Sequence, residues 1–364
     1  MKKANEMQAL AKRIIVWLGS PALVFYVMPV YMAVIIAGTV AQKELGLYRS
    51  LQLFFASPVF LSLTALLTFG VFCRFLFHSE WKREKAGIHL AHLGVLILLV
   101  GGLMTALVAR EGYITIPEGE TKLFVSDYHQ RELLIVRDGD VFARVPHQKI
   151  KRGQALSFDG LPLRIEVLNN CRNCEISERQ NVADNMRGMS RFMALGDGPL
   201  EKDEERNLYG ATLMLSGGTT EQDGMYVVFE AMPNPIEMDI DGHKVEIIYG
   251  KAQRALPFAI RLDDFAEDLY EGTSKARAFH SDIAVVEPEG VEWPVRIAMN
   301  QPLRYKGYTL FQSSFIRAEN GEEATVLAVV ENQGWLAPYI GTILMAIGLL
   351  WHAVLVMIKR GRSI

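Results

Sequence analysis

The chain has 364 residues, of which 50% are hydrophobic, and its mean hydropathy of +0.14 indicates a mixture of membrane and soluble parts. Its net charge of −3 is unevenly spread, because the amino end, residues 74–85 and the carboxyl end hold an excess of eight positive charges and leave −11 for the remainder. So acidic a remainder argues against nucleic acid as a partner. Three cysteines are too few for a scaffold built on disulfides.

The apolar segments are each long enough to cross a bilayer, which takes about 20 residues. The charge-free run 14–42 is too long for a cleaved signal peptide and predicts a retained first span after a short interfacial lead-in. The N-terminal membrane region, 1–109, has predicted spans at 21–41, 53–73 and 86–109, and a fourth span, 336–358, precedes the tail 359–364.

Basic residues predict the side on which each loop lies. The amino end, the 74–85 loop and the carboxyl end are all basic, and basic flanks mark the cytoplasmic side of a membrane. Four spans place these three segments on one side. We therefore expect a multi-pass protein of the inner (plasma) membrane, with cytoplasmic termini and with residues 110–335 on the periplasmic side.

Residues 110–335 have the alternation and turns of a β-rich domain. Segments such as 133–145 and 243–250 alternate apolar and polar residues, and Asp-Gly pairs mark hairpin turns between them. Residues 178–207 are polar and contain several Met, and we expect a helical or mobile insertion there. The predicted fold class is α+β: four transmembrane helices with one large β-rich extracytoplasmic domain inserted between helices 3 and 4.

Two histidines stand near the start of the third span. His89 and His92 are three residues apart and so share one helix face. Imidazole is costly inside a membrane and is a standard ligand of haem iron. From the residues alone, His92 is either an iron ligand or a hydrogen-bonded interfacial side chain, and His89 either supports that ligand or is an interfacial polar group.

A third histidine, His352, stands in the fourth span. It lies seven residues from Lys359, as His92 lies seven from Lys85, so we expect both about 10 Å from the inner boundary. Equal depth would permit one haem between them. The alternative is an interfacial residue beside Trp351.

Cys171 and Cys174 form a Cys-x-x-Cys pair. Residue 175 is Glu rather than His, so the pair is not a covalent haem site. No second pair of Cys or His stands at the spacing of a structural zinc site. The pair is either a structural disulfide or a redox pair that exchanges with client thiols.

Several stretches resemble the ResB family, also called CcsB, of c-type cytochrome biogenesis proteins. The third-span stretch contains a His-Leu-Gly triplet, and the most recognisable motif has the pattern Asn-x-Pro-Leu-x-Tyr-x-Gly-Tyr. The similar stretches are IIAGTVAQ (35–42), IHLAHLGVLILLVGG (88–102), the strand pair at 257–287, MNQPLRYKGYTLFQSSF (299–315) and PYIGTILMAIGLLWH (338–352).

The resemblance implies a role in haem export and cytochrome c assembly. Such proteins pair with CcsA, a membrane protein with a Trp-rich external motif, and haem is joined to the Cys-x-x-Cys-His sequence of apocytochrome c. By this match His92 is an axial ligand of haem b iron, and CcsA supplies the opposite ligand. The five Trp of this chain are scattered, so it resembles the ResB half alone, with any lyase catalysis shared and no catalytic residue of its own.

Two other classes of function are consistent with parts of the sequence. A membrane electron carrier of the di-haem cytochrome b kind needs paired histidines on two helices, and His89, His92 and His352 are the candidates. A membrane thiol–disulfide exchanger would use Cys171 and Cys174.

Overall fold

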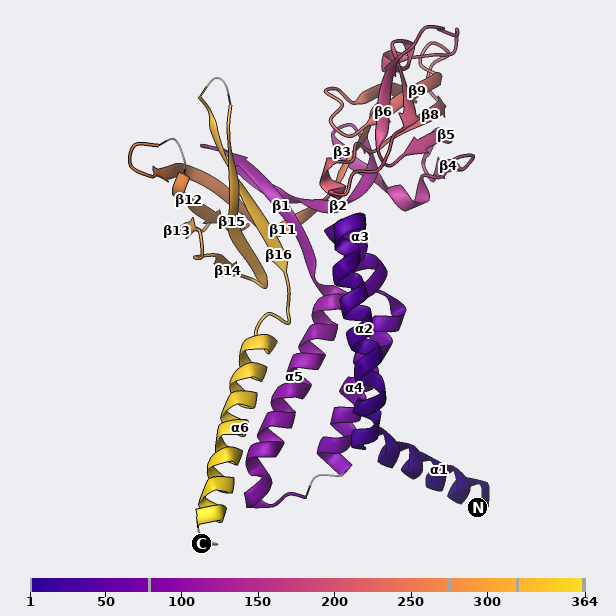
Figure 1. The fold of residues 1–364 in the computed structure, drawn as a ribbon. Coiled ribbons are helices and arrows are strands. Elements are labelled where there is room, and N and C mark those ends of the chain that lie inside the picture. Colours follow the sequence, from indigo (N-terminus) through magenta and orange to yellow (C-terminus); the bar gives the residue numbers. More distant parts are fainter. Residues whose placement is uncertain (1, 78–79, 274–275, 319–320, 362–364) are drawn as a thin grey trace. The chain divides into compact units, whose positions relative to one another are not determined.

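The apolar segments form long helices in the computed structural model of the chain, which describes residues 2–77, 80–273, 276–318 and 321–361 (Figure 1). The α-helices are α1 (Lys2–Leu18), α2 (Pro21–Leu45), α3 (Leu47–Ser50), α4 (Pro58–Phe77), α5 (Ala86–Val108) and α6 (Ala337–Gly361). Of these, α2, α4, α5 and α6 are long and apolar enough to span a membrane. The expected four-span arrangement, with a β-rich domain between the third and fourth spans, is confirmed.

The chain divides into two units. Residues 1–110 and 330–364 form the helical unit, and residues 111–329 form the β domain. Pro21 and Pro58 begin α2 and α4, where the missing N–H of proline leaves no hydrogen bond unmade. The lead-in to the first span is the separate helix α1. Residues 362–364 of the predicted tail lie outside the described residues.

Glycines let α5 and α6 approach backbone to backbone. A Cβ atom added to Gly94 would lie 2.7 Å from the Met345 nitrogen, and one added to Gly101 would lie 2.2 Å from the Ala337 Cβ. On α6, a Cβ atom added to Gly348 would lie 2.5 Å from the Ala91 nitrogen. Because any side chain at these positions would meet the partner helix, the glycines fix the register of α5 against α6.

The β domain is built from antiparallel hairpins. A ten-stranded sheet contains the order β13-β12-β11-β2-β1-β16-β15-β14, and smaller sheets have the order β4-β5-β8-β9 and the pair β6-β7. Asp138 and Gly139, with φ of 52° and 89°, form the turn between β2 and β3, as the Asp-Gly signal predicts. The strands are β1 (Arg110–Pro117), β2 (Thr121–Arg137), β3 (Asp140–Pro146), β4 (Ala155–Phe158), β5 (Leu161–Cys171), β6 (Cys174–Glu178), β7 (Met193–Asp197), β8 (Gly210–Ser216), β9 (Gly224–Phe229), β10 (Ile236–Ile240), β11 (His243–Leu269), β12 (Ala276–Val286), β13 (Glu292–Ala298), β14 (Leu303–Tyr305), β15 (Tyr308–Arg317) and β16 (Glu323–Glu331).

The long strands β2 and β11 contribute to two apolar cores. Leu133 on β2 and Ile247 on β11 lie in the core that includes β5 and β8. Val125 on β2 and Ile260 on β11 lie in the core that includes β12, β15 and β16. The register of the β2–β11 pair shifts between these two parts. One continuous strand pair therefore supports both cores of the domain.

The insertion at 178–207 is not helical. It contains strand β7 and two short 3₁₀ turns at 188–191 and 204–206, and Ser190 within it is fully buried. Its polar side chains form hydrogen bonds within the domain. For example, the Ser190 hydroxyl donates to the Met225 carbonyl oxygen at 2.6 Å. The expectation of a helix there is therefore wrong.

Candidate functional site

The close packing of α5 and α6 sets the depth of His352. A Cβ atom added to Gly87 would lie 2.6 Å from the His352 nitrogen, so His352 is level with Gly87. His92 lies five residues further along α5, which is about 7.5 Å along the axis and about 140° around it. The expected equal depth of His92 and His352 is therefore wrong, and His92 points away from the glycine face that receives α6.

His92 lines a cavity of about 320 Å³ in the helical unit. Its Nδ1 lies 2.8 Å from the Ile88 carbonyl oxygen. A carbonyl can only accept, so this bond assigns the proton to Nδ1 and leaves a lone pair on Nε2. The other residues that line the cavity are Leu18, Gly19, Ser20, Pro21, Val24, Gly70, Val71 and Arg74.

This arrangement fits the donor set expected for haem. Imidazoles that bind metals usually donate their second ring N–H to a carbonyl or carboxylate, which fixes the ring, and the Ile88 carbonyl serves His92 in this way. Arg74 places a cation on the same cavity wall, and guanidinium pairs well with carboxylates such as propionates. Among the described residues that line this cavity, His92 is the one imidazole.

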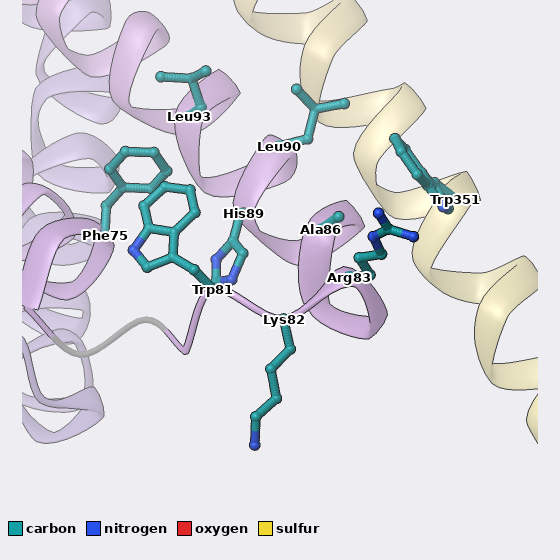
Figure 2. Close-up of a pocket in the computed structure, with 9 residues that line it drawn as sticks. All are labelled: Phe75, Trp81, Lys82, Arg83, Ala86, His89, Leu90, Leu93 and Trp351. Carbon is teal, nitrogen blue, oxygen red and sulfur yellow. The ribbon is translucent and has the colours of Figure 1, made fainter.

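His89 lies beside a different cavity, of about 380 Å³ (Figure 2). The side chain is buried, its Nε2 lies 2.8 Å from the Glu80 carbonyl oxygen, and its ring stacks against Trp81 with centroids 4.9 Å apart. The neighbours Arg74 and Phe75 of α4 line the His92 and the His89 cavities respectively. The two histidines share a broad helix face, as predicted, but α4 separates their surroundings.

The sequence did not single out the other residues of the His89 cavity. Trp81 and Arg83 come from the connection between α4 and α5, and Trp351 comes from α6. The available signal was the position of Trp81 just before the predicted third span, at a membrane boundary where amphipathic rings concentrate.

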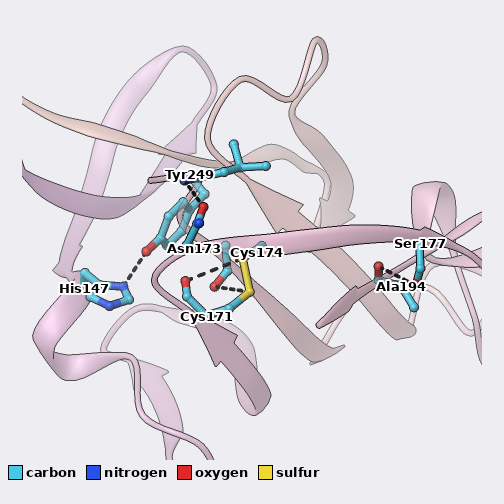
Figure 3. The surroundings of a disulfide bond; sticks show 9 residues. His147, Cys171, Asn173, Cys174, Ser177, Ala194 and Tyr249 are labelled. Atoms are coloured by element: carbon cyan, nitrogen blue, oxygen red, sulfur yellow. Dashed lines mark hydrogen bonds between the residues drawn. A yellow bond between two sulfur atoms is a disulfide. The ribbon is translucent and has the colours of Figure 1, made fainter. Parts of the chain in front are cut away.

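The structure contains a disulfide between Cys171 and Cys174 (Figure 3). Cys171 ends β5 and Cys174 begins β6, and they are 2% and 6% exposed. They pack with Leu195, Val227 and Phe229 in a small apolar cluster. Because a thiolate must reach a sulfur to exchange with it, this burial suits a structural disulfide better than a redox pair.

A buried polar network in the β domain was also missed. The fully buried guanidinium of Arg131 donates from Nε to Glu230 at 2.9 Å and from Nη1 to the Tyr128 carbonyl at 2.8 Å. It also lies 4.7 Å from the centre of the Tyr209 ring. Tyr209 donates to Glu204. Sequence alternation cannot reveal such a network, because the partners come from strands and turns far apart in the chain.

The same network displaces several pKa values. Burial, with the Arg172 and Arg131 charges, lowers the pKa of His147 to about 4. Burial alone would raise the pKa of Glu204, but hydrogen bonds from Tyr209 and Arg172 outweigh it and lower that pKa. Perturbed groups of this kind can mark active sites. Here Glu204 bonds to Arg172 and Tyr209, and His147 bonds to Tyr249, so these groups form a structural connection within the domain.

The motif at 299–315 joins strands of the second core. Gln312 of β15 accepts from Ser281 of β12 at 2.7 Å and donates to Thr325 of β16 at 2.9 Å, and Ser281 and Thr325 are fully buried. Glu287 accepts from Tyr305 and Lys306 at the turn of the motif. These contacts give the motif a structural role.

Part of the β domain matches a known protein family. The sequence model of the ResB-like family matches residues 240–334. This region is ResB-like. It holds β11 to β16 and the 299–315 motif, so the resemblance to the ResB family is confirmed there.

Two relatives each match a part of the chain. Protein NrfI of Wolinella succinogenes is 33% identical over 114 residues, which are 31% of this chain and 12% of NrfI. Cytochrome c biogenesis protein CcsB of Picosynechococcus is 29% identical over 107 residues, which are 29% of this chain and 22% of CcsB. The likeness therefore spans less than a quarter of either relative.

Proposed function

We propose that this protein is the ResB-like part of a membrane complex that exports haem and assembles cytochrome c. The observation that carries the proposal is the combination of a ResB-like region with His92, an imidazole within an apolar span whose proton is assigned by the Ile88 carbonyl. One relative of the chain is named as a cytochrome c biogenesis protein.

In this proposal haem is cargo, and its iron takes the Nε2 lone pair of His92. The chain binds and orients the haem. The Ile88 carbonyl holds the ring of His92, and the apolar walls of α2 and α4 exclude water. Arg74 pairs with a haem carboxylate. The second axial imidazole comes from a CcsA-like partner. The thiols that take up haem belong to apocytochrome c, so the chain is not an enzyme by itself.

The geometry supports the two other classes of function less well. Electron transfer through bound haems needs two imidazoles facing one cavity, whereas His89 and His92 line separate cavities. Thiol exchange needs an accessible sulfur, whereas both sulfurs of the pair are buried.

Deletion of the gene and purification of the tagged protein test the proposal. Deletion should abolish covalent haem in c-type cytochromes, and a tagged wild-type chain should copurify with a membrane protein that has a Trp-rich external segment. Normal cytochrome c in the deletion strain would contradict the proposal. A chain that purifies alone, with stoichiometric haem that cycles between redox states, would favour the electron carrier.

A further inference from the structure

The cavity beside His89 contains two polar groups that no described residue satisfies. His89 is 8% exposed, and its Nδ1 is buried without a hydrogen-bond partner. Because Nε2 donates its proton to the Glu80 carbonyl, Nδ1 carries a lone pair and needs a donor. Arg83 lines the same cavity and has no ion pair or hydrogen bond with the described residues. An occupant with both an anion and a hydrogen-bond donor would satisfy both groups.

Apart from Lys82, the remaining walls of the cavity are apolar and aromatic. Figure 2 shows Phe75 and Trp81 on one side of His89, with Leu90 and Trp351 on the other. Such walls accept hydrocarbon, because removing apolar surface from water or headgroups is favourable. The occupant therefore has an apolar body as well as an anionic, hydrogen-bonding head.

The cavity lies where a membrane span begins. The third candidate span starts at Arg83, which places the cavity where hydrocarbon meets headgroups. Lys82 also lines the cavity and Lys85 is close to it in the chain, and both pair with Glu80. This leaves Arg83 as the cation available to an incoming anion.

We propose that the cavity formed by Phe75, Trp81, Arg83, His89, Leu90 and Trp351 binds an anionic glycerophospholipid whose headgroup carries a hydroxyl, such as phosphatidylglycerol. The phosphate pairs with Arg83, and the headgroup hydroxyl donates to Nδ1 of His89. An acyl chain lies along Leu90 and Trp351. Trp81, which is 65% exposed, turns aside to admit the headgroup. This inference does not depend on the role in cytochrome c assembly.

The free nitrogen of His89 favours lipid over haem as the occupant. Nδ1 is the ring nitrogen next to the Cβ branch, where the residue's own backbone and side chain obstruct a flat macrocycle. A hydroxyl group is small enough to reach it once Trp81 has turned aside. His92 presents the more accessible Nε2 instead, in the other cavity.

Native mass spectrometry of the full chain in mild detergent tests the proposal, with phosphatidylglycerol, phosphatidylmethanol and phosphatidylcholine of matched acyl chains as probes. The wild type should retain one phosphatidylglycerol in preference to phosphatidylcholine. Arg83→Gln should weaken retention of both anionic lipids about tenfold or more, because a charge-assisted hydrogen bond is lost. His89→Phe should remove only the preference for phosphatidylglycerol over phosphatidylmethanol, which has no hydroxyl.

Two further variants serve as controls. Arg13→Gln makes the same charge change on α1, outside this cavity, and should retain lipid as the wild type does. Arg83→Lys keeps the charge and should retain most of the binding, which distinguishes a lost contact from misfolding. Equal retention of phosphatidylglycerol and phosphatidylcholine by the wild type, or equal losses in Arg13→Gln and Arg83→Gln, would overturn the proposal. So would haem in this cavity that Arg83→Gln releases.

Discussion

Gly87 of α5 lies directly against the backbone of His352 in α6, where an added Cβ would be 2.6 Å from the His352 nitrogen. This contact continues through Gly94 and Gly101 at intervals of seven residues. The α5–α6 pair is therefore a rigid frame within the helical unit. It places His92 away from α6, whereas the cavity beside His89 is also lined by Trp351 of α6.

Replacing Gly94 should disrupt this frame. We expect Gly94→Leu to destabilise the helical unit by about 1–3 kcal/mol or more, because the added side chain meets the Gly341 carbonyl and the Met345 nitrogen. Gly102 is the matched control, since no atom lies within 4 Å of its added Cβ. Thermal unfolding of the full chain in detergent measures both. Equal melting temperatures for Gly94→Leu and Gly102→Leu would show that the helices do not pack in this register.

The pKa of His147 predicts an acid-sensitive core in the β domain. The pKa of this side chain falls from its ordinary 6.5 to about 4 on folding, chiefly through burial. The unfolded chain therefore binds more protons between these values, so stability is full above about pH 6.5 and declines as pH falls towards about 4. Burial also lowers the pKa of His129, which acts in the same direction.

Hydrogen–deuterium exchange of β2 and β11 in the full chain measures this effect. Protection, corrected for intrinsic exchange, should be lower at pH 5 than at pH 7. His147→Gln, which cannot titrate but can still bond to Tyr249, should reduce the difference without abolishing it. If the variant and the wild type lose protection equally, the titrating group lies elsewhere.

Particular residues show what the sequence could predict and what it could not. The spans followed from charge-free runs, and the hairpin at Asp138 and Gly139 followed from its composition, because both are local signals. The sequence did not predict the depth of His352 in the membrane. That depth depends on how the glycines align α5 with α6, and these helices are more than 200 residues apart in the chain. The His89 cavity also did not follow, because it forms only when Trp81 folds back onto α5.

The disulfide is expected to stabilise the β domain without serving the chemistry. Cys171→Ser with Cys174→Ser should lower stability by roughly 2 kcal/mol, from the entropy of a very short loop. Cytochrome c maturation should largely survive. The single variants, which leave one free thiol, are the controls for unwanted cross-linking. Complete loss of maturation that added small thiols restore would instead assign the pair to redox exchange.

Reporter fusions test the side of the membrane on which the β domain lies. The basic flanks at the amino end, 74–85 and 359–362 predict that this domain is outside the cytoplasm. Alkaline phosphatase fused after Glu120 should be active, and the same enzyme fused after Lys82 should be inactive. A reporter that is active only in the cytoplasm should give the opposite result at both positions. Phosphatase activity after Lys82 would overturn the four-span topology.

The iron-binding role of His92 is open to chemical rescue. His92→Gly removes the imidazole and leaves a space that free imidazole can enter. The variant should lose haem from the purified complex and should not support cytochrome c maturation, and added imidazole should restore part of both. Val95→Gly places the same residue one turn along α5, on the same side, without removing a ligand, and it controls for weakening of the helix.

His352→Gly tests whether His352 is the second haem ligand. His352 is level with Gly87 and lies across the glycine contact from His92, so its loss should leave haem binding and maturation nearly unchanged. Haem lost equally in both variants, with a bis-histidine spectrum in the isolated chain, would place both ligands within this protein. Full haem loading and maturation in His92→Gly would remove His92 from the proposal. Rescue by imidazole in His92→Gly alone is the outcome that the separate cavities and the Ile88-fixed ring lead us to expect.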